Sequence, residues 1–186
     1  MKNIVIIGAG DLGKEVVWLI EDINKKMPTY VILGFLDDDK AKEAGEFYGY
    51  KVLGTIDQLE ELAAKTPLSA VIAIQDGCVR KKIVDEHKEF NAWESIIHPT
   101  AVIASSSLVG VGSLVFPQVT ISVDTKLGDF GLYYIHATIC NDCKIGNYVS
   151  IMSNATVSER AEIEDRCVLP AGCTIEPYRK LEQDRG

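Results

Sequence analysis

The sequence predicts an α/β domain with a parallel sheet, followed by a parallel β-helix. From Met1 to about Pro99, short aliphatic runs alternate with segments of helical periodicity, which is typical of parallel strands joined by crossover helices. From about Ala101 to Ile175, a large apolar residue recurs at every sixth position, a period that neither a helix nor an ordinary strand has. We therefore expect a Rossmann-like domain of about half the usual size over residues 1–97 and a β-helix domain over residues 98–186.

The first domain is expected to open on a buried strand, because residues 4–7 are all aliphatic. Apolar residues at helical spacing then follow a glycine-rich turn. The expected elements are a strand at 2–8, a helix at 11–24, a strand at 30–36, an extended segment at 51–54, a helix at 56–65, a strand at 69–74 and a helix at 78–87.

The second domain carries two registers with a period of six. Large residues run from Ile103 to Ile175, and small or compact residues run two places earlier, from Ala101 to Cys173. Each hexapeptide should form one short strand and a turn, and three should complete a coil of about eighteen residues. The large side chains are expected to fill the inside of the prism. A polar tail is expected from Glu176 onward.

The five cysteines are expected to be structural or free thiols. Cys143, Cys167 and Cys173 occupy the small-residue register, and each belongs to a different face of the predicted prism. Cys140 is expected to point away from Cys143, although the two have CxxC spacing. We therefore expect no metal site.

Composition limits the classes of partner. The chain has 186 residues with 27 acidic and 19 basic side chains, a formal net charge of −8, which disfavours nucleic acid. No apolar segment of signal or membrane length is present near Met1. We expect a cytoplasmic protein with no membrane partner.

The glycine-rich turn is the first candidate site. Gly8, Gly10 and Gly13 form a GxGxxG between the first strand and the first helix, where backbone N–H groups favour negative charge. Three readings are open: a tight turn that binds nothing, a nicotinamide site, and a site for a nucleotide-bearing ligand that is not a redox cofactor, which we favour. The expected substrate-binding residues are Gly8, Gly10, Asp11, Leu12, Gly13, Asp37 and Asp38.

The two halves together resemble one family. The segments Ile6-Ile7-Gly8-Ala9-Gly10, Phe35-Leu36-Asp37-Asp38 and Ile97-His98-Pro99-Thr100-Ala101, followed by hexapeptides, are similar to the sugar O- and N-acetyltransferases of sialic acid and bacterial amino-sugar biosynthesis. The resemblance implies a left-handed β-helix and a homotrimer that holds acetyl-CoA between neighbouring β-helices. It also implies that the first domain binds a sugar or nucleotide-sugar.

The chain departs from this family at the position of the general base. Members usually carry His-Asp or His-Glu just before a Cys-x-Ile-Gly step, and the histidine takes the proton from the acceptor. Here Asn141 and Asp142 precede Cys143-Lys144-Ile145-Gly146. An amide has no useful basicity at neutral pH. An alternative reading is that Asn141 is only a corner residue, since asparagine tolerates left-handed backbone.

Further departures follow. His136 lies too far along the same chain to replace the missing imidazole, but it could reach the site from a neighbouring subunit. Ser150 stands where the family often places a second histidine near acetyl-CoA, Asp11 should disfavour a pyrophosphate, and His87 reads as a solvated helix residue.

These observations leave three functional hypotheses. The first is an acetyl-CoA-dependent acetyltransferase acting on a sugar or nucleotide-sugar, with Asn141, Asp142 and His136 as candidate catalytic residues and Ser150 beside acetyl-CoA. The second is a catalytically degenerate relative that acts as a ligand-binding or structural trimer. The third, a nicotinamide-dependent enzyme, is disfavoured because a β-helix is an unusual second domain for hydride chemistry.

Overall fold

The computed structural model describes residues 1–42 and 45–183 and divides into two compact units. The first unit comprises Met1–Gln75 and Val79–Glu94, and the second comprises Asp76–Cys78 and the chain from Ser95 onward. The division that we expected at residues 97 and 98 stays a prediction.

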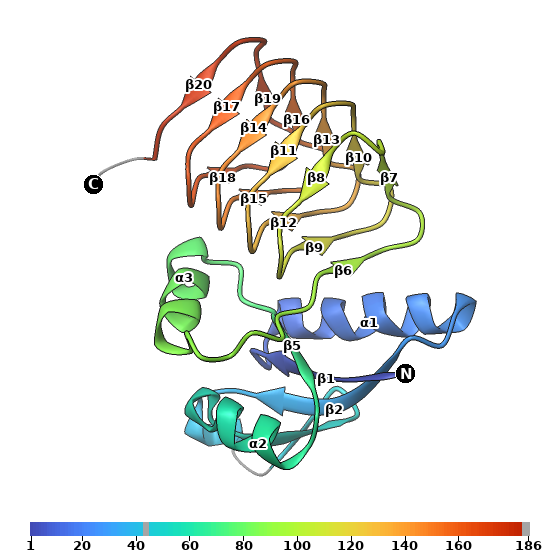
Figure 1. Cartoon of the computed structure of the whole chain (residues 1–186), viewed down its shortest axis with the longest axis vertical. Helices are drawn as coiled ribbons and strands as arrows, with labels where there is room; N and C mark the ends of the chain where they lie inside the picture. Colours follow the sequence, from blue (N-terminus) through green and yellow to red (C-terminus); the bar gives the residue numbers. More distant parts are fainter. Residues whose placement is uncertain (43–44, 184–186) are drawn as a thin grey trace. The chain divides into compact units, whose positions relative to one another are not determined.

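The first unit is built on a sheet with the strand order β3-β4-β2-β1-β5. Figure 1 labels three of these strands, β2, β1 and β5. β1 pairs in parallel with β2 and β5, and β2 pairs in parallel with β4, whereas the edge strand β3 is antiparallel. Residues 4–7 of β1 are fully buried, in agreement with their aliphatic run. The elements are β1 (Lys2–Ile7), α1 (Asp11–Lys26), β2 (Tyr30–Leu36), η1 (Lys40–Lys42), β3 (Glu46–Phe47), β4 (Tyr50–Gly54), η2 (Ile56–Gln58), α2 (Leu59–Lys65), β5 (Ser69–Ile72) and α3 (Gly77–Glu86).

The helix expected at residues 56–65 is present, but it changes type along its length. It begins as the 3-10 turn η2 and continues as α2 only from Leu59. A capping box explains the start, because the Gln58 side chain accepts the Thr55 backbone N–H at 3.1 Å. Sequence periodicity detects the buried face but not this change of helix type.

The second unit is a left-handed parallel β-helix, as the resemblance implied (Figure 1). In the described part of the chain, its strands form three parallel sheets, in the orders β7-β10-β13-β16-β19, β8-β11-β14-β17-β20 and β6-β9-β12-β15-β18. Partners in each of these sheets are eighteen residues apart, from Ile96 and Leu114 onward. The strands are β6 (Ile96–Ile97), β7 (Val102–Ile103), β8 (Leu108–Val109), β9 (Leu114–Val115), β10 (Thr120–Ile121), β11 (Lys126–Leu127), β12 (Leu132–Tyr133), β13 (Thr138–Ile139), β14 (Lys144–Ile145), β15 (Ser150–Ile151), β16 (Thr156–Val157), β17 (Glu162–Ile163), β18 (Val168–Leu169), β19 (Thr174–Ile175) and β20 (Lys180–Leu181).

The repeat extends further than we expected. Residues after Glu176 do not form only a polar tail, because β20 pairs with β17 and places Leu181 beside Ile163. Leu181 therefore continues the register of large residues by one more hexapeptide. Among the described residues, no helix is long and apolar enough to cross a lipid bilayer.

The turns of the β-helix share a left-handed residue at every sixth position. Glycine supplies it at two of these positions, and the other positions carry ordinary side chains with φ between 55° and 63°. The residues are Gly112, Gln118, Asp124, Phe130, His136, Asp142, Tyr148, Asn154, Arg160, Arg166, Gly172 and Tyr178. Because three turns complete a coil, this series gives three columns of corner residues, each with a spacing of eighteen.

Side chains of the small-residue register also form hydrogen bonds with backbone groups of neighbouring coils. Ser107 Oγ accepts the Thr125 N–H at 2.9 Å, and Thr125 Oγ1 in turn accepts the Cys143 N–H at 3.3 Å and donates to the Cys140 carbonyl oxygen at 2.7 Å. These side chains satisfy backbone groups that the turns would otherwise leave buried and unpaired. Cys143, Cys167 and Cys173 precede strands of three different sheets, as predicted.

Candidate functional site

The three glycines of the first turn have different structural roles. Gly8 has φ +105°, and a Cβ there would lie 2.8 Å from the Ala73 carbonyl oxygen. A Cβ on Gly13 would collide with the Gly8 carbonyl oxygen. Gly10, the N-cap of α1, has extended backbone, and no other group lies within 4 Å of the position that a Cβ would take. The fold thus requires Gly8 and Gly13, whereas Gly10 leaves open space at the start of α1.

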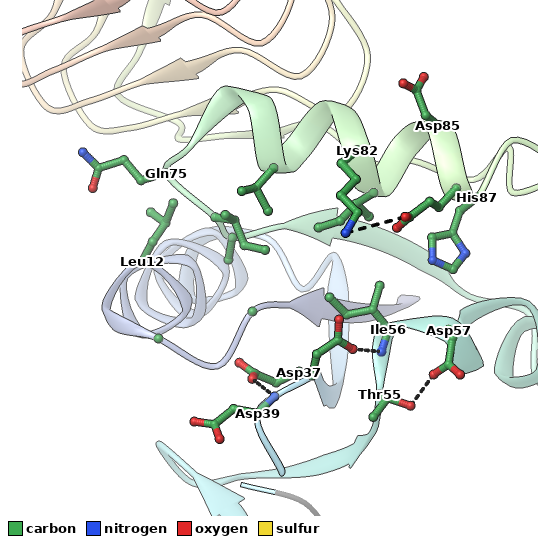
Figure 2. A pocket seen from close by; sticks show the side chains of 18 of the residues that line it. Leu12, Asp37, Asp39, Thr55, Ile56, Asp57, Gln75, Lys82, Asp85 and His87 are labelled. Atoms are coloured by element: carbon green, nitrogen blue, oxygen red, sulfur yellow. Dashed lines mark hydrogen bonds and ion pairs between the residues drawn. The ribbon is translucent and has the colours of Figure 1, made fainter. Parts of the chain in front are cut away.

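That open space belongs to a pocket of about 1380 Å³ in the first unit (Figure 2). Its lining comes from the glycine turn, the residues after β2, η2, the start of α2, the loop after β5, α3 and the residues that follow α3. Of the predicted substrate-binding residues, the structure brings Gly8, Gly10, Asp11, Leu12, Asp37 and Asp38 to this pocket. Gly13 instead packs beneath the turn, close to Phe35.

The carboxylate of Asp37 holds the glycine turn. It accepts the Ala9 N–H at 2.7 Å and the Asp39 N–H at 2.9 Å, and Lys42 Nζ lies 3.2 Å away. Burial alone would raise the pKa of Asp37, but the hydrogen bonds from Asp39, Ala9 and Lys42 outweigh it and hold the pKa below its ordinary value. Asp37 is therefore ionised at neutral pH.

Asp38 and Asp11 are also engaged within the chain. Asp38 Oδ1 accepts the Ile56 N–H at 2.9 Å and so joins the end of β2 to η2. The Asp11 side chain is 98% exposed and pairs with Lys14 at 2.9 Å, and this hydrogen bond lowers the pKa of Asp11. The ionised Asp11 stands in the first turn of α1, where its negative charge opposes the binding of an anionic ligand.

The residues that line the pocket carry a large net negative charge. Nine carboxylates line it against three lysines, so its formal charge is 3 − 9 = −6 with His87 neutral. Several acids pair with lysines, such as Glu86 with Lys82 at 3.7 Å. The carboxylates are Asp11, Asp37, Asp38, Asp39, Asp57, Glu60, Asp85, Glu86 and Glu89, and the lysines are Lys42, Lys82 and Lys88. The lining therefore favours hydroxyl and N–H groups of a ligand over its phosphates.

His87 was misread from the sequence. It is buried rather than solvated, and its Nδ1 lies 2.8 Å from Glu60 Oε1 on α2. The charged neighbours Glu86 and Lys88 suggested a surface position, and no local signal indicates a partner 27 residues earlier. His87 and Glu60 both line the pocket, which places a histidine–carboxylate pair in its wall.

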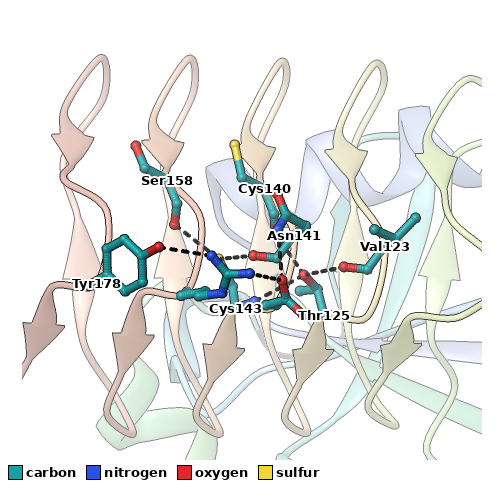
Figure 3. Close-up of polar contacts among 9 residues, drawn as sticks. Val123, Thr125, Cys140, Asn141, Cys143, Ser158 and Tyr178 are labelled. Atoms are coloured by element: carbon teal, nitrogen blue, oxygen red, sulfur yellow. Dashed lines mark hydrogen bonds and ion pairs between the residues drawn. The ribbon is translucent and has the colours of Figure 1, made fainter.

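The second candidate site lies at the corner of the β-helix between β13 and β14 (Figure 3). Asn141 Nδ2 donates to Asp142 Oδ2 at 2.8 Å, and Arg160 Nη2 lies 3.6 Å from the same oxygen. Arg160 Nη1 also donates to the Tyr178 hydroxyl at 2.9 Å. The structure thus brings Asn141 and Asp142 together, and it adds Arg160 and Tyr178 from the next two coils, which the sequence reasoning missed.

The left-handed residue at this corner is Asp142, with φ +59°, and not Asn141. The interpretation of Asn141 as a left-handed corner residue is therefore wrong, because the period of six assigns that conformation to its neighbour. A shallow pocket of about 380 Å³ adjoins the pair. It is lined by Asp124, Lys126, Asp142, Cys143, Lys144, Arg160 and Glu162.

His136 and Ser150 lie elsewhere on the β-helix. His136 is exposed at the corner between β12 and β13, with φ +61°, so within one chain it belongs to a different corner column from Asp142. Ser150 begins β15 and is fully buried. The structure does not bring either residue to Asn141 within one chain.

Two protein-family models match separate parts of the chain. Residues 3–87 match the PglD N-terminal domain, and residues 136–177 match the bacterial transferase hexapeptide repeats. No curated protein matches the sequence.

Solved structures share both halves of the chain. The acetyltransferase domain of PglB from Neisseria gonorrhoeae FA1090 has 25% identity and a TM-score of 0.85, over 97% of this chain and 85% of that chain. The same domain in complex with acetyl coenzyme A has 25% identity and a TM-score of 0.85, over 96% of this chain and 84% of that chain. PerB from Caulobacter crescentus, in complex with CoA and GDP-perosamine, has 23% identity and a TM-score of 0.74, over 97% of this chain and 91% of that chain. The resemblance to the sugar acetyltransferases is confirmed.

Proposed function

We propose that this chain, a hexapeptide-repeat acyltransferase of the sugar acetyltransferase family, transfers the acetyl group of acetyl-CoA to the amino group of a nucleotide-linked sugar. The observation that carries the proposal is the Asn141–Asp142 pair at the corner between β13 and β14, joined by a hydrogen bond of 2.8 Å. It occupies the step before Cys143-Lys144-Ile145-Gly146 at which the family places its base and the carboxylate that orients it. The acetyl-CoA complex of the PglB domain supports the choice of co-substrate.

The absence of a histidine at position 141 bears on whether the acetyl group is accepted by a hydroxyl or by an amine. A sugar hydroxyl is almost fully protonated at neutral pH and needs a positioned base to become a nucleophile. An amine has a pKa much closer to neutral, about 7.7–8.0 for an unperturbed α-amino group, so a useful fraction is already unprotonated. Asn141 therefore favours an amine acceptor over a hydroxyl acceptor.

The pocket of the first unit is the proposed nucleotide-sugar site. Its open space at Gly10 admits a ligand to the start of α1, while the acidic lining, with Asp37 and Asp38, suits ribose hydroxyls and base N–H groups. Asp11 keeps the pyrophosphate from sitting directly on the first turn of α1. Gly8, Leu12 and Gly13 shape the same turn.

The assembly proposed for this function is a cytoplasmic homotrimer with acetyl-CoA between neighbouring β-helices. The flat faces of the prism leave apolar side chains exposed, among them Val102 at 63% and Leu108 at 64%, which a symmetric oligomer would cover. In such a trimer, His136 of one chain would approach the Asn141–Asp142 corner of another. Ser150, the residue expected beside acetyl-CoA, is fully buried in its own chain and has no exposed surface for a direct contact with it.

A second candidate function is a degenerate trimer that binds the ligand without transferring the acetyl group. The same Asn141 favours it, because an amide cannot take a proton from the acceptor. Release of CoA thiol from acetyl-CoA, measured with a panel of amino-sugar nucleotides, separates the two. Thiol release that depends on an amino sugar supports the transferase, and ligand binding without thiol release supports the degenerate trimer.

A further inference from the structure

Glu159 occupies the position of Asn141 in the next coil. Three backbone hydrogen bonds establish the column: Asp142 N–H donates to the Val123 carbonyl oxygen at 3.1 Å, Arg160 N–H to that of Asn141 at 3.0 Å, and Tyr178 N–H to that of Glu159 at 3.0 Å. Adjacent coils of a parallel β-structure lie about 4.8 Å apart. The carboxylate of Glu159 therefore projects from the same corner as the Asn141 amide, one coil further along.

The Glu159 carboxylate is available for a ligand. The residue is partly exposed, and among residues 1–42 and 45–183 its side chain has no hydrogen bond or ion pair. The adjacent residue in the chain, Arg160, is a cation that is already held by the Tyr178 hydroxyl and Asp142. Burial, and secondly the negative charge of Glu159, raise the pKa of Cys140, which agrees with a carboxylate close to this corner.

We propose that Glu159 is the general base of the transfer, displaced by one coil from the position where the family carries histidine. This inference rests on the proposed function. The acceptor nitrogen attacks the thioester carbonyl carbon, a C–N bond forms, and Glu159 accepts the proton that leaves the nitrogen. When the C–S bond breaks, CoA departs as a thiolate and takes up one proton, so amine and acetyl-CoA give amide and CoA thiol. Asn141, held by Asp142, would then bind rather than deprotonate the acceptor.

The test compares Glu159→Gln with Glu164→Gln. Glu164 is another partly exposed glutamate, but it lies at a different corner, between β17 and β18, where it pairs with Lys180 at 2.9 Å. Positioned general bases contribute about 10²–10⁴-fold, and we expect kcat to fall at least about tenfold in Glu159→Gln with KM for both substrates unchanged. Glu164→Gln should match the wild type. Thermal unfolding of both variants checks that they are folded.

Chemical rescue distinguishes a base from a structural group. Added formate should restore part of the activity of Glu159→Ala, and Glu159→Asp should keep more activity than Glu159→Gln. The pH dependence of kcat is compared between the wild type and Asp142→Asn, because Asp142 also titrates at this corner. Other titratable groups there are Asp124, Cys140, Cys143, Arg160 and Tyr178.

Two outcomes would count against the proposal in different ways. An active wild type with an equally active Glu159→Gln, or a loss in Glu159→Ala that formate does not restore, overturns the role of Glu159 and leaves the proposed function intact. A wild type that releases no thiol with any amino sugar overturns the proposed function itself.

Discussion

Replacing Asn141 with histidine should raise the rate of acetyl transfer at least about tenfold. Asparagine Nδ2 and histidine Nδ1 are the same number of bonds from Cα, so the introduced imidazole can keep the 2.8 Å hydrogen bond to Asp142 Oδ2. That bond fixes the proton on Nδ1 and leaves Nε2 free as the base. With an unperturbed pKa of about 6.5, the imidazole is largely neutral at a pH of about 7.5.

The expected size of the gain follows from the surroundings of Asp142. A positioned base typically contributes about 10²–10⁴-fold. Arg160 lies 3.6 Å from the same Asp142 oxygen, and this cation weakens the carboxylate's support of an imidazolium. A tenfold gain corresponds to about 1.4 kcal/mol of transition-state stabilisation. The double change Asn141→His with Arg160→Gln should raise the rate further.

The assay is the initial rate of CoA thiol release with saturating acceptor. Thermal stability should change little, because position 141 lies in a turn and its side chain is not part of the core. His136→Ala is the companion control and should lower the wild-type rate only if a neighbouring subunit supplies His136 as the base. A wild type that is already fast and is unaffected by either change would refute the assignment of position 141 to the catalytic base.

The remaining predictions concern the glycine turn and the assembly. Gly10→Val should abolish the binding of a uridine-type sugar nucleotide, measured by calorimetry. The variant should lose only about 0.5–1 kcal/mol of stability, from the weaker N-cap, because no group of the fold lies within 4 Å of the new Cβ. Gly8→Ala should instead lower the stability by about 1–3 kcal/mol, because φ at Gly8 is +105° and the new Cβ would collide with the Ala73 carbonyl oxygen. If the wild type bound NAD more tightly than the sugar nucleotide, the assignment of the glycine turn to a sugar nucleotide would be wrong. Light scattering at micromolar concentration should give a trimer, and a stable monomer would count against the proposed assembly.

Most of the fold follows from periodicity in the sequence. The period of six predicted the three faces of the β-helix and the inward side chains, because every coil repeats the same steric demand at the same position. Strand β2 was predicted at its observed bounds, Tyr30–Leu36, since an aliphatic run between turn residues is a local signal. The antiparallel β3 was not expected, because two residues carry no period.

The candidate sites were less predictable, since they depend on partners far apart in the chain. The GxGxxG motif indicated the turn, but only the positions of Ala73 and Gly8 separate the glycines that the fold needs from Gly10. The His87–Glu60 pair joins α3 and α2, and neither residue has a local signal for it. Likewise, Glu159 becomes a candidate base only once the coils are stacked, eighteen residues after Asn141.

The central claim is acetyl transfer from acetyl-CoA to the amine of a nucleotide-linked sugar. Mass spectrometry of the wild-type reaction, with each amino-sugar nucleotide paired with its hydroxyl analogue, tests this claim most directly. The account predicts one added acetyl group, attached to nitrogen, on an amino sugar and none on the hydroxyl analogue. An acetyl ester on the hydroxyl analogue, or no acetylated product from any amino sugar, would contradict it.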